Sequence, residues 1–107
     1  MFDKVYEKPE PAREQVDAWA GPAVLEFGTD WCEICQGTQT MLRQVFSEFG
    51  GVHHLKISDG KGKPLGRSFR VKLWPTLIYL KDGKEVARSV RPTNEEDVRS
   101  GLRAITE

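Results

Sequence analysis

The two cysteines of the chain lie two residues apart in the stretch Trp31-Cys32-Glu33-Ile34-Cys35. Thiolates attack disulfides, so such a pair can form a mixed disulfide with a partner and then resolve it. The pair follows the apolar run 24–27 and precedes residues with helical spacing, which predicts a strand-to-helix junction. There Cys32 lies near free backbone N–H groups, whose partial positive charge favours a thiolate. Cys35, one turn further along, can close a disulfide with Cys32.

Two alternatives exist for this pair. The first is a pair of inert thiols or a fixed disulfide, but a bridge between cysteines so close together closes too small a loop to stabilise a fold much. The second is a zinc site completed by His53 and His54. Adjacent strand residues point to opposite faces, so these histidines cannot easily share one ion. We therefore predict thiol-disulfide exchange by the dithiol itself, without a metal or an organic cofactor.

The rest of the chain supplies elements that can hold the pair. Residues 23–27 predict a central strand, and the residues after Cys35 predict a helix that ends at Gly50-Gly51. The other predicted elements are an edge strand over 4–7, a helix over 12–20, strands over 52–58, 77–80 and 85–90, a short helix over 64–69 and a last helix from Thr93 to Ile105. Thr93 is its predicted N-cap, with Glu96 completing a capping box.

This order of elements predicts an α/β fold with a central mixed sheet in three layers, helices covering both faces. A chain of 107 residues is expected to form a single domain over residues 1–107. Sixteen basic residues, scattered along the chain, balance sixteen acidic ones. We therefore expect no general attraction to nucleic acid or to a membrane surface. The chain is expected to be monomeric and cytoplasmic as given, or exported to the periplasm if a signal peptide has been removed.

Three motifs make the chain resemble the thioredoxin family over nearly its whole length. They are Trp31-Cys32-Glu33-Ile34-Cys35 after a strand with an internal acid, Trp74-Pro75-Thr76 at the start of a hairpin, and Lys81-Asp82-Gly83 at its turn. The resemblance implies a thioredoxin-like fold and a protein-disulfide oxidoreductase. Its partners would be a protein disulfide or dithiol substrate and a separate reductase or thiol pool.

The resemblance also implies roles for individual residues. Cys32 would attack and Cys35 would resolve the mixed disulfide. Pro75 would be cis, leaving the backbone of Trp74 to pair with an extended substrate segment. The resemblance places Glu26 at the position of an acid that exchanges a proton with the resolving cysteine, and Lys56 at that of a lysine near it. Glu26 is alternatively a structural acid paired with Lys56, and its pKa should be raised unless the lysine reaches it.

Several residues depart from the family pattern. Glu33 and Ile34 stand between the cysteines in place of Gly-Pro, Gly28 replaces a tryptophan, and Thr40 replaces a proline. Arg91 stands where a glycine is usual, and Trp74 is large for its position. These changes indicate a narrower partner than that of a general thioredoxin.

The predicted substrate-binding residues are Trp31, Trp74, Pro75, Thr76 and Arg91. Trp31 and Trp74 can form a docking surface or simply pack against the protein. Arg91 can anchor an acidic substrate group or be an ordinary solvated arginine. Two further functions stay open: a binding module in which redox activity is vestigial, and a metal carrier that uses the two sulfurs.

Overall fold

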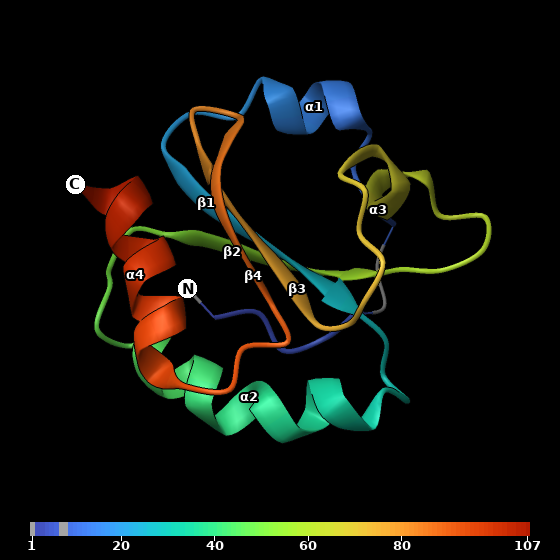
Figure 1. The fold of residues 1–107 in the computed structure, drawn as a ribbon. Coiled ribbons are helices and arrows are strands. Elements are labelled where there is room, and N and C mark those ends of the chain that lie inside the picture. The colour runs from blue at the N-terminus through green and yellow to red at the C-terminus, as the bar shows by residue number, and fades with distance from the viewer. Residues whose placement is uncertain (1, 7–8) are drawn as a thin grey trace.

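The computed structural model describes residues 2–6 and 9–107, in which one sheet has helices on both faces (Figure 1). The elements are α1 (Arg13–Asp17), β1 (Pro22–Gly28), α2 (Glu33–Phe46), β2 (His53–Ser58), α3 (Pro64–Ser68), β3 (Thr76–Lys81), β4 (Lys84–Val90) and α4 (Glu95–Thr106). The predicted α/β class and three-layer arrangement are confirmed. No helix within the described ranges is both long enough and apolar enough to cross a membrane.

The sheet has the strand order β2-β1-β3-β4, with β1 and β3 in its centre. β1 runs parallel to β2 and antiparallel to β3, while β3 and β4 form an antiparallel hairpin. The right-handed crossover rule explains why the helix between the parallel strands packs back onto the sheet. β1 carries the chain directly into the cysteine pair, so the central strand positions the site.

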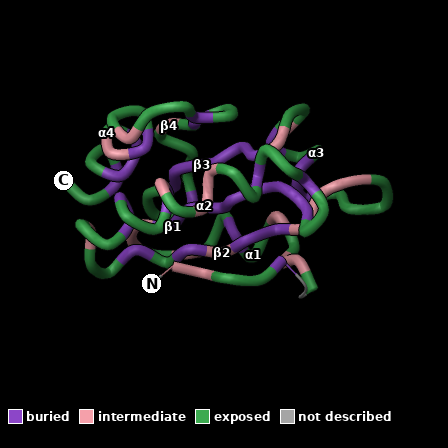
Figure 2. Tube along the Cα trace, turned by 90° about the horizontal axis from the view of Figure 1, so that it is seen from below, coloured by how far each residue is buried: buried purple, intermediate pink, exposed green. Residues whose placement is uncertain are grey.

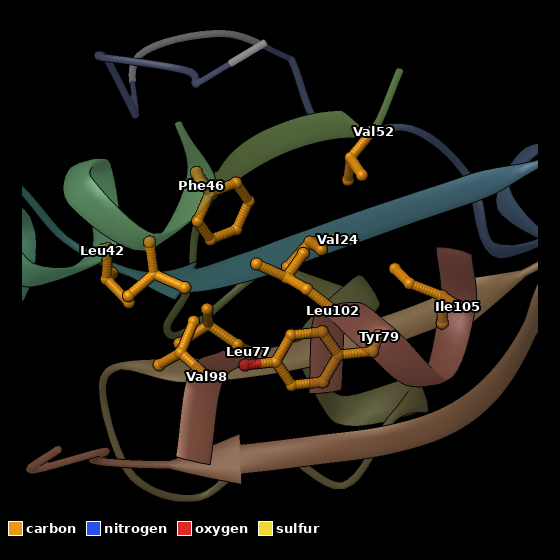
Figure 3. Packing of buried hydrophobic residues seen from close by; sticks show 10 residues of the cluster. Val24, Leu42, Phe46, Val52, Leu77, Tyr79, Val98, Leu102 and Ile105 are labelled. Carbon is orange, nitrogen blue, oxygen red and sulfur yellow. The ribbon is translucent and has the colours of Figure 1, made fainter. Parts of the chain in front are cut away.

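Side chains alternate across β1 and divide the core into two layers. Val24 joins the cluster under α2 and α4, where Leu42, Tyr79 and Leu102 are fully buried (Figure 3). Leu25 and Phe27 point to the other face and pack with α1 and α3, where Val16 and Leu65 close the second cluster. Burial is concentrated along the two central strands (Figure 2).

The expected edge strand over 4–7 does not form over residues 4–6, and residue 7 lies outside the described residues. Side-chain bonds replace a strand ladder there. The Asp3 carboxylate accepts a hydrogen bond from the Lys56 backbone N–H at 2.9 Å. The Asp3 backbone N–H in turn donates to Nδ1 of His54 at 2.8 Å. The segment thus lies beside β2 without adding a fifth strand to the sheet.

Helix boundaries also differ from the prediction. The first helix covers only Arg13–Asp17, and the second ends at Phe46, before the glycine pair 50–51. In α4 the N-cap is Asn94, one residue after Thr93, and its side chain accepts from the Asp97 backbone N–H at 2.9 Å. Asn caps helices well, so the neighbouring amide takes the place of the threonine hydroxyl.

Two helical glycines make a matched pair for testing the packing of α4. A Cβ at Gly101 would overlap the ring of the fully buried Tyr79, whereas a Cβ at Gly37 meets nothing within 4 Å. Gly37→Ala should raise the free energy of unfolding by about 1 kcal/mol through helix propensity. Gly101→Ala should lower it by roughly 1–2 kcal/mol, because overpacking outweighs the same propensity gain. Urea denaturation measures both, and equal stability of the two variants would contradict this packing.

Candidate active site

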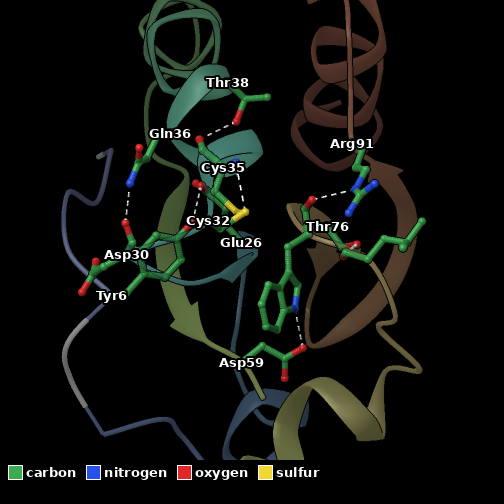
Figure 4. The surroundings of a disulfide bond; sticks show 12 residues. Tyr6, Glu26, Asp30, Cys32, Cys35, Gln36, Thr38, Asp59, Thr76 and Arg91 are labelled. Carbon is green, nitrogen blue, oxygen red and sulfur yellow. Dashed lines mark hydrogen bonds between the residues drawn. A yellow bond between two sulfur atoms is a disulfide. The ribbon is translucent and has the colours of Figure 1, made fainter. Parts of the chain in front are cut away.

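Cys32 and Cys35 form a disulfide at the start of α2, with 5.2 Å between their Cα atoms (Figure 4). Cys32 is the N-cap residue, and its Sγ accepts a hydrogen bond from the Cys35 backbone N–H at 3.1 Å. Cys32 is 9% exposed and Cys35 is 1% exposed. The sulfur of Cys32 therefore combines the greater access with a helix N-terminal amide, which stabilises negative charge.

A loop with a cis peptide bond between Trp74 and Pro75 lies beside the disulfide. The Trp31 and Trp74 rings meet edge to face with centroids 5.6 Å apart, which joins this loop to the residue before Cys32. Thr76 is buried, and its hydroxyl donates to the Leu73 carbonyl at 2.6 Å. Thr76 thus closes the loop and offers almost no surface to a substrate, unlike the expectation for it.

Arg91 contacts the same loop through its backbone and its side chain. Its N–H donates to the Pro75 carbonyl at 2.8 Å, and its Nε donates to the Trp74 carbonyl at 2.9 Å. Arg91 is exposed, so its guanidinium also borders solvent. A substrate segment that pairs with the Trp74 carbonyl must therefore share that oxygen with Arg91 or displace it.

Large apolar side chains are exposed in the cysteine motif, in the loop before Pro75 and on β4 opposite Thr76. Trp31 is 73% exposed, so it does not pack into the core. Ile34, Leu73 and Val90 are also large apolar residues with exposed surfaces. Apolar residues gathered at one place on a surface indicate a site for a partner. Trp74 is half-buried, with its indole N–H donating to Asp59 at 2.9 Å.

Glu26 has no exposed surface and lies on the α2 side of β1. Its Oε2 accepts from the Tyr6 hydroxyl at 3.0 Å and from Gln39 Nε2 at 2.9 Å. The Lys56 ammonium lies 3.4 Å from the same oxygen, as predicted. The other oxygen lies 2.8 Å from His54 Nε2. Because Asp3 donates to His54 Nδ1, the neutral ring carries its proton on Nε2 and donates it to Glu26.

The charge state of Glu26 follows from these contacts. Burial acts to raise the pKa of its carboxyl, but the hydrogen bond and electrostatic interaction with His54, together with the charge of Lys56, lower it by more. The pKa of Glu26 therefore lies below its ordinary value of 4.5. Burial and the Glu26 carboxylate raise the pKa of Tyr6, so its hydroxyl keeps its proton and remains a donor.

A polar cavity of about 180 Å³ borders the buried sulfur side of the disulfide. Its lining residues include Cys35, Thr29, Gln39 and Lys56. The Thr29 hydroxyl oxygen is buried and has no hydrogen-bond partner among the described residues. A cavity of this size has room for several water molecules, and the hydroxyl marks a place where one can bind. Cys35 therefore has a polar route toward the side chains that surround Glu26.

The absence of a side chain at Gly28 is required by its neighbours. A Cβ there would lie 2.6 Å from Cys35 Sγ and 2.7 Å from the Tyr6 hydroxyl oxygen. Tyr6, from the N-terminal segment, thus occupies the space beside the disulfide where the family pattern has a tryptophan at position 28. The aromatic ring of Tyr6 therefore compensates for the missing side chain at Gly28.

Comparisons with known proteins agree with this geometry. The family model described as thioredoxin matches residues 5–104. The chain belongs to the thioredoxin family. It is similar to the solved structure of thioredoxin 2 from Pseudomonas aeruginosa PAO1 in its reduced form, with 48% identity and a TM-score of 0.86 over 97% of this chain and 96% of that one.

Curated relatives are also thioredoxins. The thioredoxin of Chlamydia muridarum is 38% identical over 72 residues, which cover 66% of this chain and 70% of that protein. Thioredoxin H-type 1 of Nicotiana tabacum is 32% identical over 73 residues, or 68% of this chain. The match spans only 58% of the tobacco protein's own length. Family membership confirms the predicted thiol-disulfide oxidoreductase class and the Cys-x-x-Cys motif of a thioredoxin.

The two histidines of this thioredoxin-family chain have structural partners of their own, apart from the cysteines. His54 is held by Glu26 and Asp3, whereas the His53 ring contacts Trp19 on the other face of the sheet, with ring centroids 4.8 Å apart and planes tilted by 50°. Within residues 2–6 and 9–107, no cluster of three or more histidine, cysteine or acidic residues could hold a metal ion. The His53 and His54 zinc hypothesis therefore has no geometric support.

Sequence reasoning missed four residues that complete this thioredoxin-family site: Tyr6, Gln39, His54 and Asp59. Gln39 links the acid to the disulfide, because its Nε2 donates both to Glu26 and to the Cys35 carbonyl, each at 2.9 Å. Its Oε1 accepts from the Lys56 ammonium. The signal for Gln39 was present, since it lies one helical turn after Cys35 on the same face. Tyr6 lies far from the motif and offered no such signal.

The buried carboxylate generates a prediction about stability and pH. Glu26→Gln leaves the Lys56 ammonium buried without its counter-ion, which should cost roughly 3–5 kcal/mol of unfolding free energy at neutral pH. Since folding lowers the pKa of Glu26, its carboxylate contributes stability above pH 4.5 and loses it as the pH falls through the folded-state pKa. Urea denaturation from pH 7 to pH 3 should show the gap between wild type and variant narrowing below pH 4.5.

The exposed Glu33 offers the matched control for this measurement. Glu33→Gln also removes one negative charge, but from an exposed residue next to Cys32. It should leave the unfolding free energy within about 0.5 kcal/mol of wild type. If the difference in unfolding free energy between wild type and Glu26→Gln stayed constant with pH, the partners of Glu26 would not stabilise its ionised form, which would contradict this account.

Proposed function

We propose that this chain reduces or exchanges disulfides in protein substrates, with Cys32 as attacking group and Cys35 as resolving group. The observation that carries the proposal is the hydrogen bond from the Cys35 N–H to Cys32 Sγ at 3.1 Å. After reduction of the disulfide, the same amide faces a thiolate, and a bond to a charged acceptor is stronger than one to a neutral acceptor. Greater exposure of Cys32 makes it the sulfur that a substrate reaches.

The reaction consists of two displacements at sulfur. The Cys32 thiolate attacks one sulfur of the substrate disulfide, and the other substrate sulfur leaves as a thiolate that takes up a proton. Cys35 then loses its proton and attacks Cys32 Sγ, which releases the second substrate thiolate and forms the Cys32-Cys35 disulfide. The substrate gains two electrons and the cysteine pair loses two. A separate reductase or thiol pool restores the dithiol, and no metal or organic cofactor enters either step.

The proton of Cys35 leaves through the polar cavity. Cavity water beside the buried Thr29 hydroxyl takes it up, and Lys56 lines the same space. Glu26 does not line the cavity but fixes Lys56, Gln39 and Tyr6, which do. Glu26 and Lys56 therefore assist the resolving step by setting the field around the water, and Glu26 acts as a positioning residue.

Substrate docking uses the apolar surface around the opening. Trp31 and Trp74 flank the disulfide, and the extended backbone of a substrate runs along the loop at Pro75. Arg91 shares the Trp74 carbonyl with that backbone and presents a cation to it. Aromatic rings and an arginine are the residue types that contribute most to binding at protein interfaces.

Single-turnover reaction of the reduced protein with insulin tests the two steps. Wild type should release reduced insulin, whereas Cys35→Ser should stop at a mixed disulfide through Cys32, seen as a covalent adduct by mass spectrometry. Glu26→Gln should form the adduct at the wild-type rate but resolve it more slowly, by up to about 10²-fold.

Cys32→Ser is the control, because it keeps Cys35 but removes the accessible sulfur. It should form no adduct. An adduct of Cys32→Ser equal to that of Cys35→Ser would contradict the assigned roles, and wild-type protein that binds insulin without reducing it would favour the binding-module alternative.

A further inference from the structure

A basic cavity of about 480 Å³ lies next to the substrate loop and is used by neither displacement step. Its lining contains four cationic side chains and one carboxylate: Lys63, Arg67, Arg70, Lys72 and Asp59. The lining therefore carries a formal net charge of +3, although the whole chain has a net charge of zero. Its volume is that of a typical ligand pocket.

The four cationic side chains have no partner in the part of the chain that the structure describes. Among the described residues, none of the four side chains makes an ion pair or hydrogen bond, whereas Arg13, Arg88, Arg99 and Arg103 are all paired with carboxylates. The single acid of the lining, Asp59, accepts instead from the Trp74 indole N–H. Four like charges around one cavity repel one another. A bound anion would offset this electrostatic repulsion.

The backbone holds one of these cations in an unfavourable conformation. Arg70 follows α3 with a φ of 59°, in the left-handed region. The Val71 N–H donates to the Gly66 carbonyl and the Arg70 N–H to the Arg67 carbonyl, which is the hydrogen-bond pattern of a helix end that glycine normally occupies. An arginine there costs stability that glycine would not. Its side chain lines the cavity, which gives a reason for the residue type that local structure does not.

The cavity is continuous with the docking surface through Trp74. Trp74 lines the cavity and its ring meets that of Trp31, the residue before the attacking cysteine. An extended segment whose backbone follows the loop at Pro75 can thus place neighbouring side chains in the cavity. Carboxylates are the side chains that four unpaired cations would attract.

We propose that this cavity binds acidic side chains of the protein substrate that lie within a few residues of its reactive disulfide. The inference rests on the proposed exchange function and specifies which substrates that function prefers. Electrostatic attraction to the cavity adds to the rate of encounter and sets the direction in which the substrate segment lies. It also makes the preference sensitive to salt, because the cavity opens to solvent.

Two disulfide peptides that differ only beside the reactive cysteine test the proposal. One carries Asp and Glu there and the other carries Asn and Gln. The rate of reduction is measured with dithiothreitol as electron source, and the rate with dithiothreitol alone is subtracted. Wild type should reduce the acidic peptide about tenfold faster at low salt, as kcat/KM, with the ratio falling as salt is raised. The ratio should fall in Arg70→Gly, which removes one of the four cations, and should approach one in Arg67→Glu, which replaces a cation with an anion.

Arg70→Gly separates charge from folding, because glycine suits the left-handed backbone at that position. Its unfolding midpoint in urea should be equal to or above that of wild type while the peptide preference falls. Lys84→Glu is the matched control, since it reverses an exposed charge at the far end of β3 from Trp74. It should keep the wild-type ratio.

The outcomes separate this inference from the function on which it rests. Reduction of neither peptide would overturn the proposed function itself. Reduction of both at equal rates at low salt would overturn the cavity's role and leave the function standing. Tight binding of a labelled single-stranded DNA at physiological salt, lost in Arg67→Glu and unaccompanied by a peptide preference, would overturn the assignment to an acidic protein segment.

Discussion

The Glu26 carboxylate has no exposed surface and lies in the central strand β1, so its negative charge must be balanced by hydrogen bonds and cations inside the protein. Leaving a buried charge unpaired costs several kcal/mol, a large part of the stability of a domain of this size. Four side chains from different parts of the chain supply the compensation: Tyr6, Gln39, His54 and Lys56. The N-terminal segment, β1, α2 and β2 are thereby held together beneath the disulfide. The buried charge network therefore connects three elements of the fold to the helix that carries the cysteines.

The same network explains how the sheet places the start of α2. Gln39 links the Cys35 carbonyl to Glu26 by two hydrogen bonds. The first turn of α2 is therefore held in place by β1 and does not depend on the helix propensity of its own residues. Gly37 and Thr38 are poor helix formers, which makes the tertiary contact necessary. With the first turn fixed, the Cys35 amide stays directed at Cys32 Sγ. Structural and chemical roles of the buried acid are therefore compatible.

Periodic elements and the motif were predictable because their signals are local. The alternation of β1, the apolar face of α4 and the cysteine spacing each lie within a short stretch, and the structure confirms the fold that they predict. The edge strand failed because Asp3 bonds β2 through its carboxylate, which no local pattern reveals. The cap of α4 was misplaced by one residue because Thr93 and Asn94 are both good caps.

Contacts between residues that are distant in the chain could not be predicted from the sequence either. Tyr6 fills the space beside Gly28 from a segment more than twenty residues away in the chain. The basic residues between positions 63 and 72 give no local signal of a site, since the lack of a carboxylate partner among the described residues appears only in three dimensions. In each case the missing information was the partner, and partners distant in sequence come together only through the topology of the sheet.

The central claim is that the helix N-terminus and exposure together make Cys32 the reactive sulfur. Timed alkylation of the reduced protein with iodoacetamide at pH 7, followed by peptide mass spectrometry, tests it most directly. Our account predicts that Cys32 is modified first and that Cys35 stays largely unmodified while the protein is folded. Equal modification of the two cysteines, or modification of Cys35 first, would contradict it.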